Sequence, residues 1–416
     1  MSSLQHCLLL LIISAGSALL ENYAIARESR KKHSQGRYPP QSHFPLRAPI
    51  KGQVLFWEKV FYEHPSSRVL IHDSIAPEKI IDVIDFMAYA RQHNSSKMPE
   101  KKVRDDLIMA YLNRYRMALK RFRLMGKKAL RHGAIEQRIF SIYKKNSRDL
   151  SDLFRGKIQI RSQQGLADEF LKAAQRAQHY LPFMEDTFKR EKVPPEITRL
   201  AFVESMFTPW ARSKVGASGI WQFMPRTAKK YLRINRLIDE RNSPYKSTIA
   251  AAKLLRDNYQ KLQSWPLAIT AYNHGTSGIR HAVRKTGSRY IHKIIQKYRS
   301  RSFGFASRNF YTEFIAAFRV YDHLLVNGAI KNHPKQHQNL RAIRLLRPMT
   351  ASQILAQSKI PESQFKKLNP CIRDVAFSRY KHTKLPDSFE LYLPESLITD
   401  FRVTMKLSRD RNYVAQ

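Results

Sequence analysis

Cysteine is nearly absent from this sequence. Its 416 residues include only Cys7 and Cys371, and Cys7 lies in an N-terminal stretch that we expect to be removed from the mature chain. One remaining cysteine cannot form a disulfide within the chain, even in an oxidising compartment. The sequence therefore excludes a small disulfide-held scaffold, and the chain is long enough for two or three domains with hydrophobic cores.

Motifs that bind nucleotides or metals are absent as well. The sequence contains no glycine-rich phosphate loop of the Walker type and no His-Glu-x-x-His helix, and its 15 histidines are scattered. We therefore expect no metal site and no cofactor, because acid–base chemistry and substrate distortion can support catalysis without them.

Acidic residues are scarce compared with basic ones. The 74 Lys and Arg residues outnumber the 33 Asp and Glu residues, which gives a formal net charge of +41 and predicts attraction to polyanions. Nucleic acid would be the first candidate partner for an intracellular protein, whereas anionic cell-wall polymers and lipid head groups suit an exported one. Residues 114–131 hold eight basic residues and no acidic one, which indicates either a polyanion-binding face or a solvated basic helix face.

The N-terminal residues have the pattern of a sorting signal. Residues 7–20 form an apolar stretch that is short for a membrane span, and Ala24-Ile25-Ala26 provides a small-x-small cleavage site. We interpret residues 1–26 as a cleaved secretory signal, which predicts export to the periplasm or cell envelope. Leu4-Gln5-His6 does not fit a lipoprotein signal, so no lipid anchor is expected; retention of the apolar stretch as a membrane tether is the alternative.

Helical periodicity dominates the rest of the chain, so the predicted fold class is mainly α. Beyond the helices, residues 343–394 show a strand, helix, helix, strand order. The predicted organisation is a signal peptide at 1–26, a disordered linker at 27–43, a helical N-terminal region at 44–161, a compact helical domain at 165–326, a linker at 327–342, a small α+β segment at 343–396 and a basic, frayed tail at 397–416.

Local patterns add detail to this organisation. Val69-Leu70-Ile71 fit a short strand, whereas residues 80–88 place apolar side chains on one helical face. An amphipathic helix is predicted from Gln164 to Pro182. Another helix is predicted after the turn at residues 243–244, with Ser247 as its cap.

One glutamate lies on the apolar face of a predicted helix. Residues 194–209 predict this helix, because prolines open and close it, and Glu204 falls on the same face as Ile197, Leu200 and Ala201. Desolvation would favour the protonated form of its carboxyl, and a proton donor poised near neutral pH is what general-acid catalysis needs. The alternative is a structural glutamate satisfied in the core by an arginine or a backbone amide.

No second carboxylate accompanies Glu204 in the nearby sequence. The next acidic residues are Asp239 and Glu240. Glycosidases with paired carboxylates need the second group as nucleophile or to activate water. If the chain is a glycosidase, its sequence therefore predicts a site with one acid.

Four motifs lie in order along the predicted helical domain. They are Glu204-Ser205, Gly-Ala-Ser-Gly-Ile-Trp-Gln-Phe-Met at 216–224, Ala-Tyr-Asn-His-Gly at 271–275 and Ser-Arg-Asn-Phe-Tyr at 307–311. Together they resemble the soluble lytic transglycosylase (SLT) domain of bacterial murein-cleaving enzymes, especially the branch related to membrane-bound lytic transglycosylase D. The resemblance covers roughly residues 165–326 and implies a lysozyme-like helical fold.

The resemblance also implies a reaction. Enzymes of this family cleave the bond between N-acetylmuramic acid (MurNAc) and N-acetylglucosamine (GlcNAc) without consuming water. By resemblance Glu204 is the acid that protonates the glycosidic oxygen, and the same carboxylate is then the base that takes a proton from the MurNAc 6-hydroxyl, which closes a 1,6-anhydro ring. A hydroxyl within the substrate makes a second protein carboxylate unnecessary.

The matching positions imply six residues that bind the sugar around Glu204. They are Ser213, Gln222, Met224, Tyr272, Asn273 and Tyr311. Gln222 and Met224 should line the cleft beside Glu204, and Tyr311 should approach it from the far side. Each residue has a structural alternative, such as a turn residue for Ser213 or a helix-end cap for Asn273.

The segment at 343–396 resembles a divergent LysM module, a peptidoglycan-binding domain. Leu368-Asn369-Pro370 and Leu391-Tyr392-Leu393-Pro394 fit its pattern, but the usual Gly-Asp near its start is absent and residues 374–384 form an apparent insertion. Glycan binding and a structural appendage both remain open for this segment.

Two other functions compete with the transglycosylase. A peptidoglycan hydrolase of the goose-lysozyme kind would share the domain shape and would need an acid to position water, for which Asp239, Glu240 and Asp257 are candidates. The other is a non-catalytic protein that binds polyanions or the cell wall through its charge. The expected partner is peptidoglycan, with anionic envelope polymers as a further candidate and no specific nucleic acid.

Overall fold

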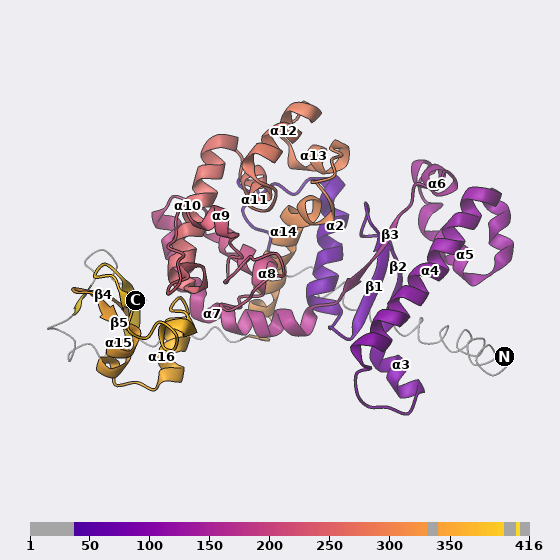
Figure 1. Cartoon of the computed structure of the whole chain (residues 1–416). Helices are drawn as coiled ribbons and strands as arrows, with labels where there is room; N and C mark the ends of the chain where they lie inside the picture. Colours follow the sequence, from indigo (N-terminus) through magenta and orange to yellow (C-terminus); the bar gives the residue numbers. More distant parts are fainter. Residues whose placement is uncertain (1–36, 331–339, 395–404, 408–416) are drawn as a thin grey trace.

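The computed structural model describes residues 37–330, 340–394 and 405–407. The predicted signal peptide at 1–26 lies outside these residues, as do parts of both predicted linkers and most of the predicted tail. Figure 1 shows three bodies: a central helical body, a body of strands and helices built by N-terminal residues, and a small C-terminal body. Each body has its own hydrophobic core. Helices predominate in the described chain, which confirms the mainly α class.

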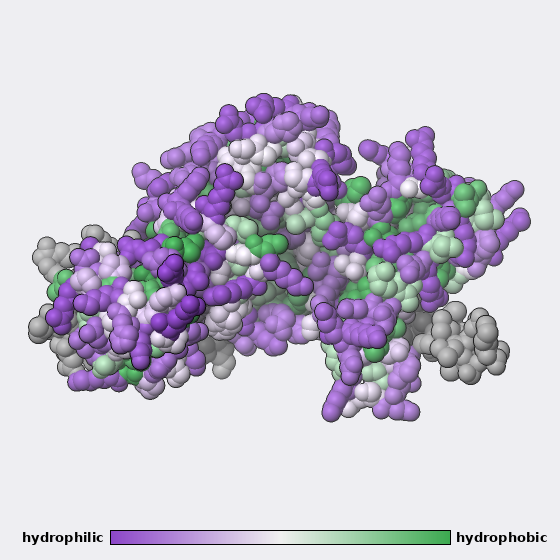
Figure 2. Space-filling view, viewed as in Figure 1, coloured by the Kyte–Doolittle hydropathy of each residue, from purple (hydrophilic) through white to green (hydrophobic). Residues whose placement is uncertain are grey.

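The face of the molecule seen in Figure 2 is mainly hydrophilic. Figure 2 shows hydrophilic residues over most of the visible face, with scattered hydrophobic patches on the central and N-terminal bodies. Among the described residues, no helix has both the length and the apolar content needed to cross a membrane.

The central body is organised around α14 (Phe305–Val326), which is buried along most of its length. Three helices that carry or support the candidate site pack against it: α2 (Ala48–Glu58), α8 (Leu200–Ser205) and α11 (Trp265–His274). A helix that is buried on all sides belongs to the centre of a core. The other elements of the body are η2 (Lys59–Glu63), α7 (Ala167–Arg190), η4 (Pro195–Arg199), α9 (Pro225–Ala228), η5 (Glu240–Asn242), α10 (Pro244–Leu262), α12 (Thr276–Thr286) and α13 (Ile291–Lys297).

The chain enters the central body earlier than predicted. Arg37 forms an ion pair with Asp322 at 3.0 Å. The guanidinium of Arg319 lies 3.8 Å from the ring centre of Tyr38, and Phe44 is fully buried in the central core. This segment therefore packs on α14 instead of forming a disordered linker, and α2 belongs to the central core instead of a separate N-terminal region.

α7 extends beyond its predicted end. Pro182 lies inside the helix, although an internal proline costs about 3 kcal/mol. Leu181, Met184 and Phe188 are buried around it in the central core. Burying side chains of this size contributes roughly 1.5–3 kcal/mol each, so packing outweighs the cost of the proline.

The helix predicted at 194–209 is shorter and less regular than expected. It consists of the 3-10 turn η4 followed by α8, which ends at Ser205. The cap of α10 also differs: the Ser243 hydroxyl accepts a hydrogen bond from the Lys246 N–H at 3.3 Å, whereas Ser247 lies inside the helix.

The N-terminal body contains a three-stranded antiparallel sheet. Its strands are β1 (Arg68–Asp73), β2 (Ile80–Asp85) and β3 (Ile160–Gln164), in the order β2-β1-β3. The short strand predicted at 69–71 is confirmed. The helix predicted at 80–88 is wrong for residues 80–85, because their β-branched side chains suit a strand that pairs with β1.

Helices cover this sheet. The Asp85 carboxylate caps α3 (Phe86–Gln92) by accepting from the N–H groups of Met87 and Ala88. The cap explains why a helix begins only after β2. The remaining elements are α4 (Lys101–Met125), η3 (Gly126–His132), α5 (Ala134–Tyr143) and α6 (Ser147–Phe154).

The C-terminal body has the predicted strand, helix, helix, strand order. Its main sheet has β4 (Leu340–Leu345) between β7 (Glu390–Pro394) and β8 (Met405–Leu407), and β5 (Met349–Thr350) pairs with β6 (Lys384–Leu385). β4 begins within the predicted linker, and β8 lies within the predicted tail, so both of those boundaries are wrong. The elements are β4 (Leu340–Leu345), β5 (Met349–Thr350), α15 (Ala351–Ser358), α16 (Glu362–Leu368), η6 (Asp374–Ala376), β6 (Lys384–Leu385), β7 (Glu390–Pro394) and β8 (Met405–Leu407).

The central body completes the C-terminal core. Leu237 and Ile238 are buried in that core, and Ile238 forms a β-bridge with Ile372. The rings of Tyr245 and Tyr392 stack with their centres 4.4 Å apart. The two bodies are therefore joined by packed side chains.

Candidate active site

Glu204 occupies the last turn of α8. The chain reverses directly after it, because Met206 and Phe207 adopt left-handed backbone conformations with φ of 50° and 55°. Non-glycine residues in this region cost free energy and persist only where the surroundings hold them. The Ser205 hydroxyl supplies one such restraint by donating to the Ile220 carbonyl at 2.7 Å. The backbone next to Glu204 is thereby tied to the second motif.

Replacing Ser205 with alanine tests this connection. Ile220 is fully buried, so Ser205→Ala leaves its carbonyl without this donor, and we expect the free energy of unfolding to fall by about 1–3 kcal/mol. Denaturant unfolding measures the change. Ser277→Ala on α12, at an exposed position, is the matched control, and an equal effect of the two substitutions would contradict the assignment.

Glu204 is a partly exposed carboxyl without a partner. It forms no hydrogen bond or ion pair with any residue in the described ranges. Burial raises its pKa to about 8, and the charge of Glu313 adds to this effect. Such an acid holds its proton at neutral pH and can donate it to a substrate.

Glu313 is a second carboxyl at this site, and it is not among the predicted site residues. It lies on α14, which packs against α8. Burial raises its pKa to about 8 as well. It too has no hydrogen-bond or ion-pair partner in the part of the chain that the structure describes. The available sequence signal is its position two residues after the motif at 307–311.

Tyr272 lies close to Glu204 at the end of α11. Gly275, with φ of 84°, follows the last residue of this helix, as predicted. The Tyr272 hydroxyl donates to the Trp221 carbonyl at 2.8 Å. Burial and then the charge of Glu204 raise the pKa of Tyr272 well above 10. Tyr272 is therefore a neutral hydroxyl that connects the second and third motifs beside Glu204.

Asn273 is exposed, and a residue of α14 holds its side chain. The Ser307 hydroxyl donates to Asn273 Oδ1 at 2.8 Å and lies 3.2 Å from His274 Nδ1. The amide N–H groups of Asn273 have no partner within the described residues. The fourth motif thus orients the third, with one donor group left for a ligand.

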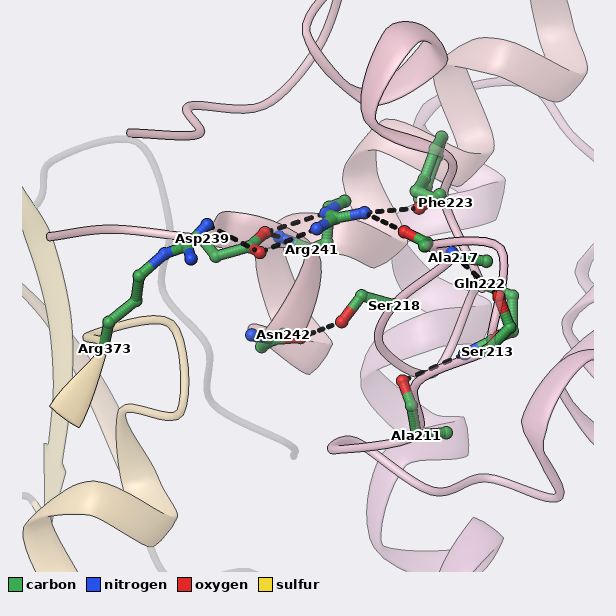
Figure 3. Close-up of polar contacts among 11 residues, drawn as sticks. Ala211, Ser213, Ala217, Ser218, Gln222, Phe223, Asp239, Arg241, Asn242 and Arg373 are labelled. Carbon is green, nitrogen blue, oxygen red and sulfur yellow. Dashed lines mark hydrogen bonds and ion pairs between the residues drawn. The ribbon is translucent and has the colours of Figure 1, made fainter. Parts of the chain in front are cut away.

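Ser213 and Gln222 hold the loop of the second motif together (Figure 3). Gln222 Nε2 donates to the Ala211 carbonyl at 3.1 Å and to the Gly219 carbonyl at 2.9 Å. The Ser213 hydroxyl accepts from the Ala217 N–H at 2.9 Å. Their contacts in the structure are structural ones, and the predicted contacts with sugar stay predictions.

Arg241 fixes the same loop (Figure 3). Its Nη1 donates to the Gly216 and Phe223 carbonyls at 2.7 and 3.0 Å. Its Nε and Nη2 donate to the two carboxylate oxygens of Asp239 at 2.9 and 2.8 Å. Arg373 of the C-terminal body contacts the same carboxylate at 3.2 Å. This buried network therefore links the motif loop to the C-terminal body, and sequence patterns do not reveal it.

The three acids considered for a hydrolase are engaged elsewhere. Asp239 belongs to the network around Arg241. Glu240 forms an ion pair with Lys246 at 2.7 Å, and Asp257 accepts from the Tyr231 hydroxyl at 2.6 Å. None of them has the unpaired carboxylate that water activation requires. Within the described ranges, no group of three His, Cys, Asp or Glu side chains could hold a metal ion.

Met224 and Tyr311 differ in their access to a ligand. Met224 is 42% exposed, so a substrate can reach it. Tyr311 is fully buried, and its hydroxyl donates to the Pro45 carbonyl at 3.2 Å. The N-terminal segment thus covers Tyr311 in this structure, and its contact with sugar stays a prediction.

The comparisons with known proteins point to the region around these residues. Residues 182–295 match the family model of the transglycosylase SLT domain. Membrane-bound lytic murein transglycosylase D of Escherichia coli (strain K12) is 34% identical over 116 residues, which cover 27% of this chain and 26% of that protein. A putative tributyltin chloride resistance protein of Alteromonas sp. (strain M-1) is 30% identical over 110 residues, which cover 26% of this chain and 53% of that protein. The chain thus spans about a quarter of the first relative and about half of the second.

Two solved structures are similar to parts of the chain. The 70 kDa soluble lytic transglycosylase Slt70 of Escherichia coli is 24% identical, with a TM-score of 0.27 and coverage of 33% of this chain and 23% of that one. The lytic transglycosylase Slt of Pseudomonas aeruginosa is 18% identical, with a TM-score of 0.29 and coverage of 53% and 38%. TM-scores this low do not support a conclusion about the arrangement of the chain. Residues 182–295, which include Glu204, Gln222 and Tyr272, are the part that matches the transglycosylase SLT domain.

Proposed function

We propose that this chain is a lytic transglycosylase that cleaves the β-1,4 bond between MurNAc and GlcNAc in peptidoglycan. The observation that carries this proposal is Glu204: an unpaired, partly exposed carboxyl with a pKa of about 8, within the segment that matches the SLT domain. The name of the Escherichia coli relative, a lytic murein transglycosylase, supports the choice of substrate.

The first chemical step uses the proton of Glu204. The protonated carboxyl donates it to the glycosidic oxygen while the bond between that oxygen and C1 of MurNAc breaks. The leaving GlcNAc thereby departs as a neutral alcohol, and positive charge develops on C1 and the ring oxygen. Glu204, now a carboxylate, stabilises that charge.

The second step returns the proton. The 6-hydroxyl of the same MurNAc forms a bond to C1, and its proton passes to the Glu204 carboxylate. The product is a 1,6-anhydro-MurNAc end, no water is consumed, and Glu204 is again protonated. Because the nucleophile belongs to the substrate, it acts at a high effective concentration.

A goose-lysozyme-like hydrolase is the second candidate, and Glu313 is the observation that favours it. A hydrolase needs a further group to activate water, and Glu313 is a second carboxyl near Glu204. Its pKa of about 8 leaves it largely protonated at neutral pH, however. A protonated carboxyl cannot accept a proton from water, so the electrostatics favour the transglycosylase.

The pH dependence of activity tests the influence of Glu313 on Glu204. Activity should fall as the pH rises through about 8, because Glu204 then loses the proton that it donates. Glu313→Gln removes a like charge and lowers the pKa of Glu204, so the alkaline fall should begin at lower pH. Profiles of kcat/KM against pH measure both effects, with Glu100→Gln, at an exposed position before α4, as the control. Coincident wild-type and Glu313→Gln profiles would show that the charges do not interact.

The same pKa shifts predict a loss of stability at alkaline pH. Burial raises the pKa of both carboxyls from 4.5 to about 8, so the folded state holds protons that the unfolded state has lost. Stability should therefore decrease as the pH rises from about 4.5 to 8. Glu313→Gln should reduce this decrease, which thermal unfolding at acidic and alkaline pH can measure.

Digestion of purified peptidoglycan by the mature chain tests the proposed activity. Released muropeptides should weigh one water less than the products of a hydrolase and should end in 1,6-anhydro-MurNAc. Reducing-end products would favour the hydrolase. An absence of products from folded protein would favour the non-catalytic alternative, in which the chain binds the wall through its charge.

The other parts of the chain would place this activity at the cell wall. We propose that residues 1–26 direct export to the periplasm or cell envelope, which agrees with the relative that is named membrane-bound. Glycan binding by the LysM-like segment at 343–396 is part of the same proposal. Attraction of the basic chain to anionic envelope polymers would assist it.

A further inference from the structure

A cavity of about 410 Å³ opens on the N-terminal body, on a different body from Glu204. Residues of α4, of α6 and the segment after it, and of β3 line it. Its wall carries Arg116, Lys120 and Arg123, and no carboxylate lines it. The cavity thus combines a defined shape with charge of one sign.

The three cations form one stripe along α4. Their spacing of four and three residues places them on the same helical face over two turns. All three are exposed, and none forms an ion pair with a described residue; Arg116 donates to the neutral side chain of Asn113 at 3.1 Å. Like charges at this spacing repel one another, so a bound anion would relieve the repulsion.

Some other cations of the N-terminal body form ion pairs within it. Arg121, also on α4, forms an ion pair with Glu136, and Arg138 forms one with Asp82. Near the cavity, Asp152 already pairs with Lys157 at 3.3 Å. The three cations of the stripe therefore line the cavity without a carboxylate in its wall to neutralise them.

The floor of the cavity is apolar, and Gly156 in its wall limits the position of Arg123. Leu119, Leu153 and Ile160 are almost fully buried beneath it. Gly156 has no side chain and so leaves room for Arg123. A Cβ at this position would lie only 2.6 Å from Arg123 Cδ. The aliphatic part of Arg123 thus rests against Gly156, which restricts the directions that its guanidinium can take.

We propose that this cavity binds the phosphate group of a phosphate-bearing ligand. Two guanidinium groups and one ammonium group can surround phosphate oxygens, and arginine can contact them through two parallel hydrogen bonds. The apolar floor accommodates the part of the ligand attached to the phosphate. A lipid head group and a soluble phosphate ester both provide this chemistry. The inference does not depend on the proposed catalytic function.

Titration of the full chain with inorganic phosphate, and separately with phosphatidylglycerol vesicles, tests the proposal. The triple variant Arg116→Gln, Lys120→Gln and Arg123→Gln removes the stripe. The matched triple variant Lys127→Gln, Lys128→Gln and Arg131→Gln removes the same charge from exposed positions of η3 that do not line the cavity. Calorimetry at low salt reports saturable binding, and thermal unfolding shows whether each variant is folded.

We expect binding that the cavity variant weakens by at least about tenfold and the η3 variant leaves nearly unchanged, because direct charge-assisted contacts contribute more than distant charges. Loss of vesicle binding alone would assign a lipid head group, and loss of phosphate binding would assign a soluble phosphate ester. Equal weakening by the two variants, or the absence of binding to wild type, would overturn the proposal.

Gly156→Ala provides a test without a change in charge. The added methyl group displaces the side chain of Arg123, and φ of 66° at this position adds strain. Binding should weaken several-fold in protein that remains folded. Unchanged affinity would contradict the role of Arg123 in the cavity.

Discussion

Glu204→Gln should abolish peptidoglycan cleavage, with a loss of at least about 10²–10⁴-fold, the range attributed to general acid–base catalysis. An amide can neither donate the first proton nor accept the second, so both proposed steps fail. The substitution preserves the size of the side chain and adds no charge. It is therefore a direct test of the chemistry of this carboxyl.

The stability of Glu204→Gln shows whether a loss of activity comes from lost chemistry or from unfolding. Glu204 is an unpaired carboxyl whose pKa is raised to about 8 by burial and then by Glu313. A neutral amide avoids the cost of ionising that group, so Glu204→Gln should unfold at the same temperature as wild type or higher, particularly above pH 8. Release of soluble muropeptides, measured beside thermal unfolding, checks both statements. A folded variant with wild-type activity would remove Glu204 from the mechanism.

Asp239→Asn should destabilise the protein by about 3–5 kcal/mol, the usual effect of leaving a buried charge without its partner. Arg241 is 8% exposed. Its Nε and Nη2 groups, which both donate to the Asp239 carboxylate, would face a neutral amide in the variant. The loop from Gly216 to Phe223 is held by the same guanidinium. Activity below the unfolding temperature should therefore fall as well, because the loop is no longer fixed.

Arg373→Met is the control for that experiment. Arg373 also contacts Asp239, but its side chain is 32% exposed. Partly exposed ion pairs contribute about 0–1 kcal/mol, so this substitution should have a small effect on unfolding. Equal effects of Asp239→Asn and Arg373→Met would show that the contact between the bodies, and not the pair with Arg241, dominates.

Acid conditions should reproduce the effect of Asp239→Asn. Burial opposes ionisation of Asp239, but the hydrogen bonds and charge of Arg241 outweigh it and hold the pKa below its ordinary value of 3.8. The unfolded state therefore binds a proton before the folded state does. The stabilisation from this group is complete above the ordinary pKa and is lost as the pH falls through the lower, folded-state pKa.

The sequence allowed prediction of those site properties that depend only on neighbouring residues. The helical spacing around Glu204 places it on an apolar face, and desolvation of that face follows from the sequence alone. Glu313 was not predictable in this way, because it approaches Glu204 only when α14 packs against α8. Helical periodicity shows which face of a helix is buried, but it does not show which other helix will cover that face.

Tyr311 and residues 80–85 show two further limits. Tyr311 lies in a segment that resembles a motif of the SLT family, but the segment that contains Pro45 covers it, and that contact spans most of the chain. The apolar residues at 80–85 fit a helical face as well as a strand. Their conformation is set by pairing with β1, which itself pairs with the distant strand β3. A contact far apart in sequence covers Tyr311, whereas residues 80–85 form a hairpin with β1, whose other neighbour is the distant strand β3.

Digestion of peptidoglycan in water enriched in heavy oxygen tests the central claim most directly. If Glu204 donates its proton to the glycosidic oxygen and then takes one from the MurNAc 6-hydroxyl, no solvent oxygen enters the new chain ends, and Glu204→Gln releases no such ends. Mass spectrometry of the muropeptides should then show unlabelled 1,6-anhydro-MurNAc. Heavy oxygen at C1 of MurNAc would instead show that water is the nucleophile, and the account of Glu204 as both acid and base would be contradicted.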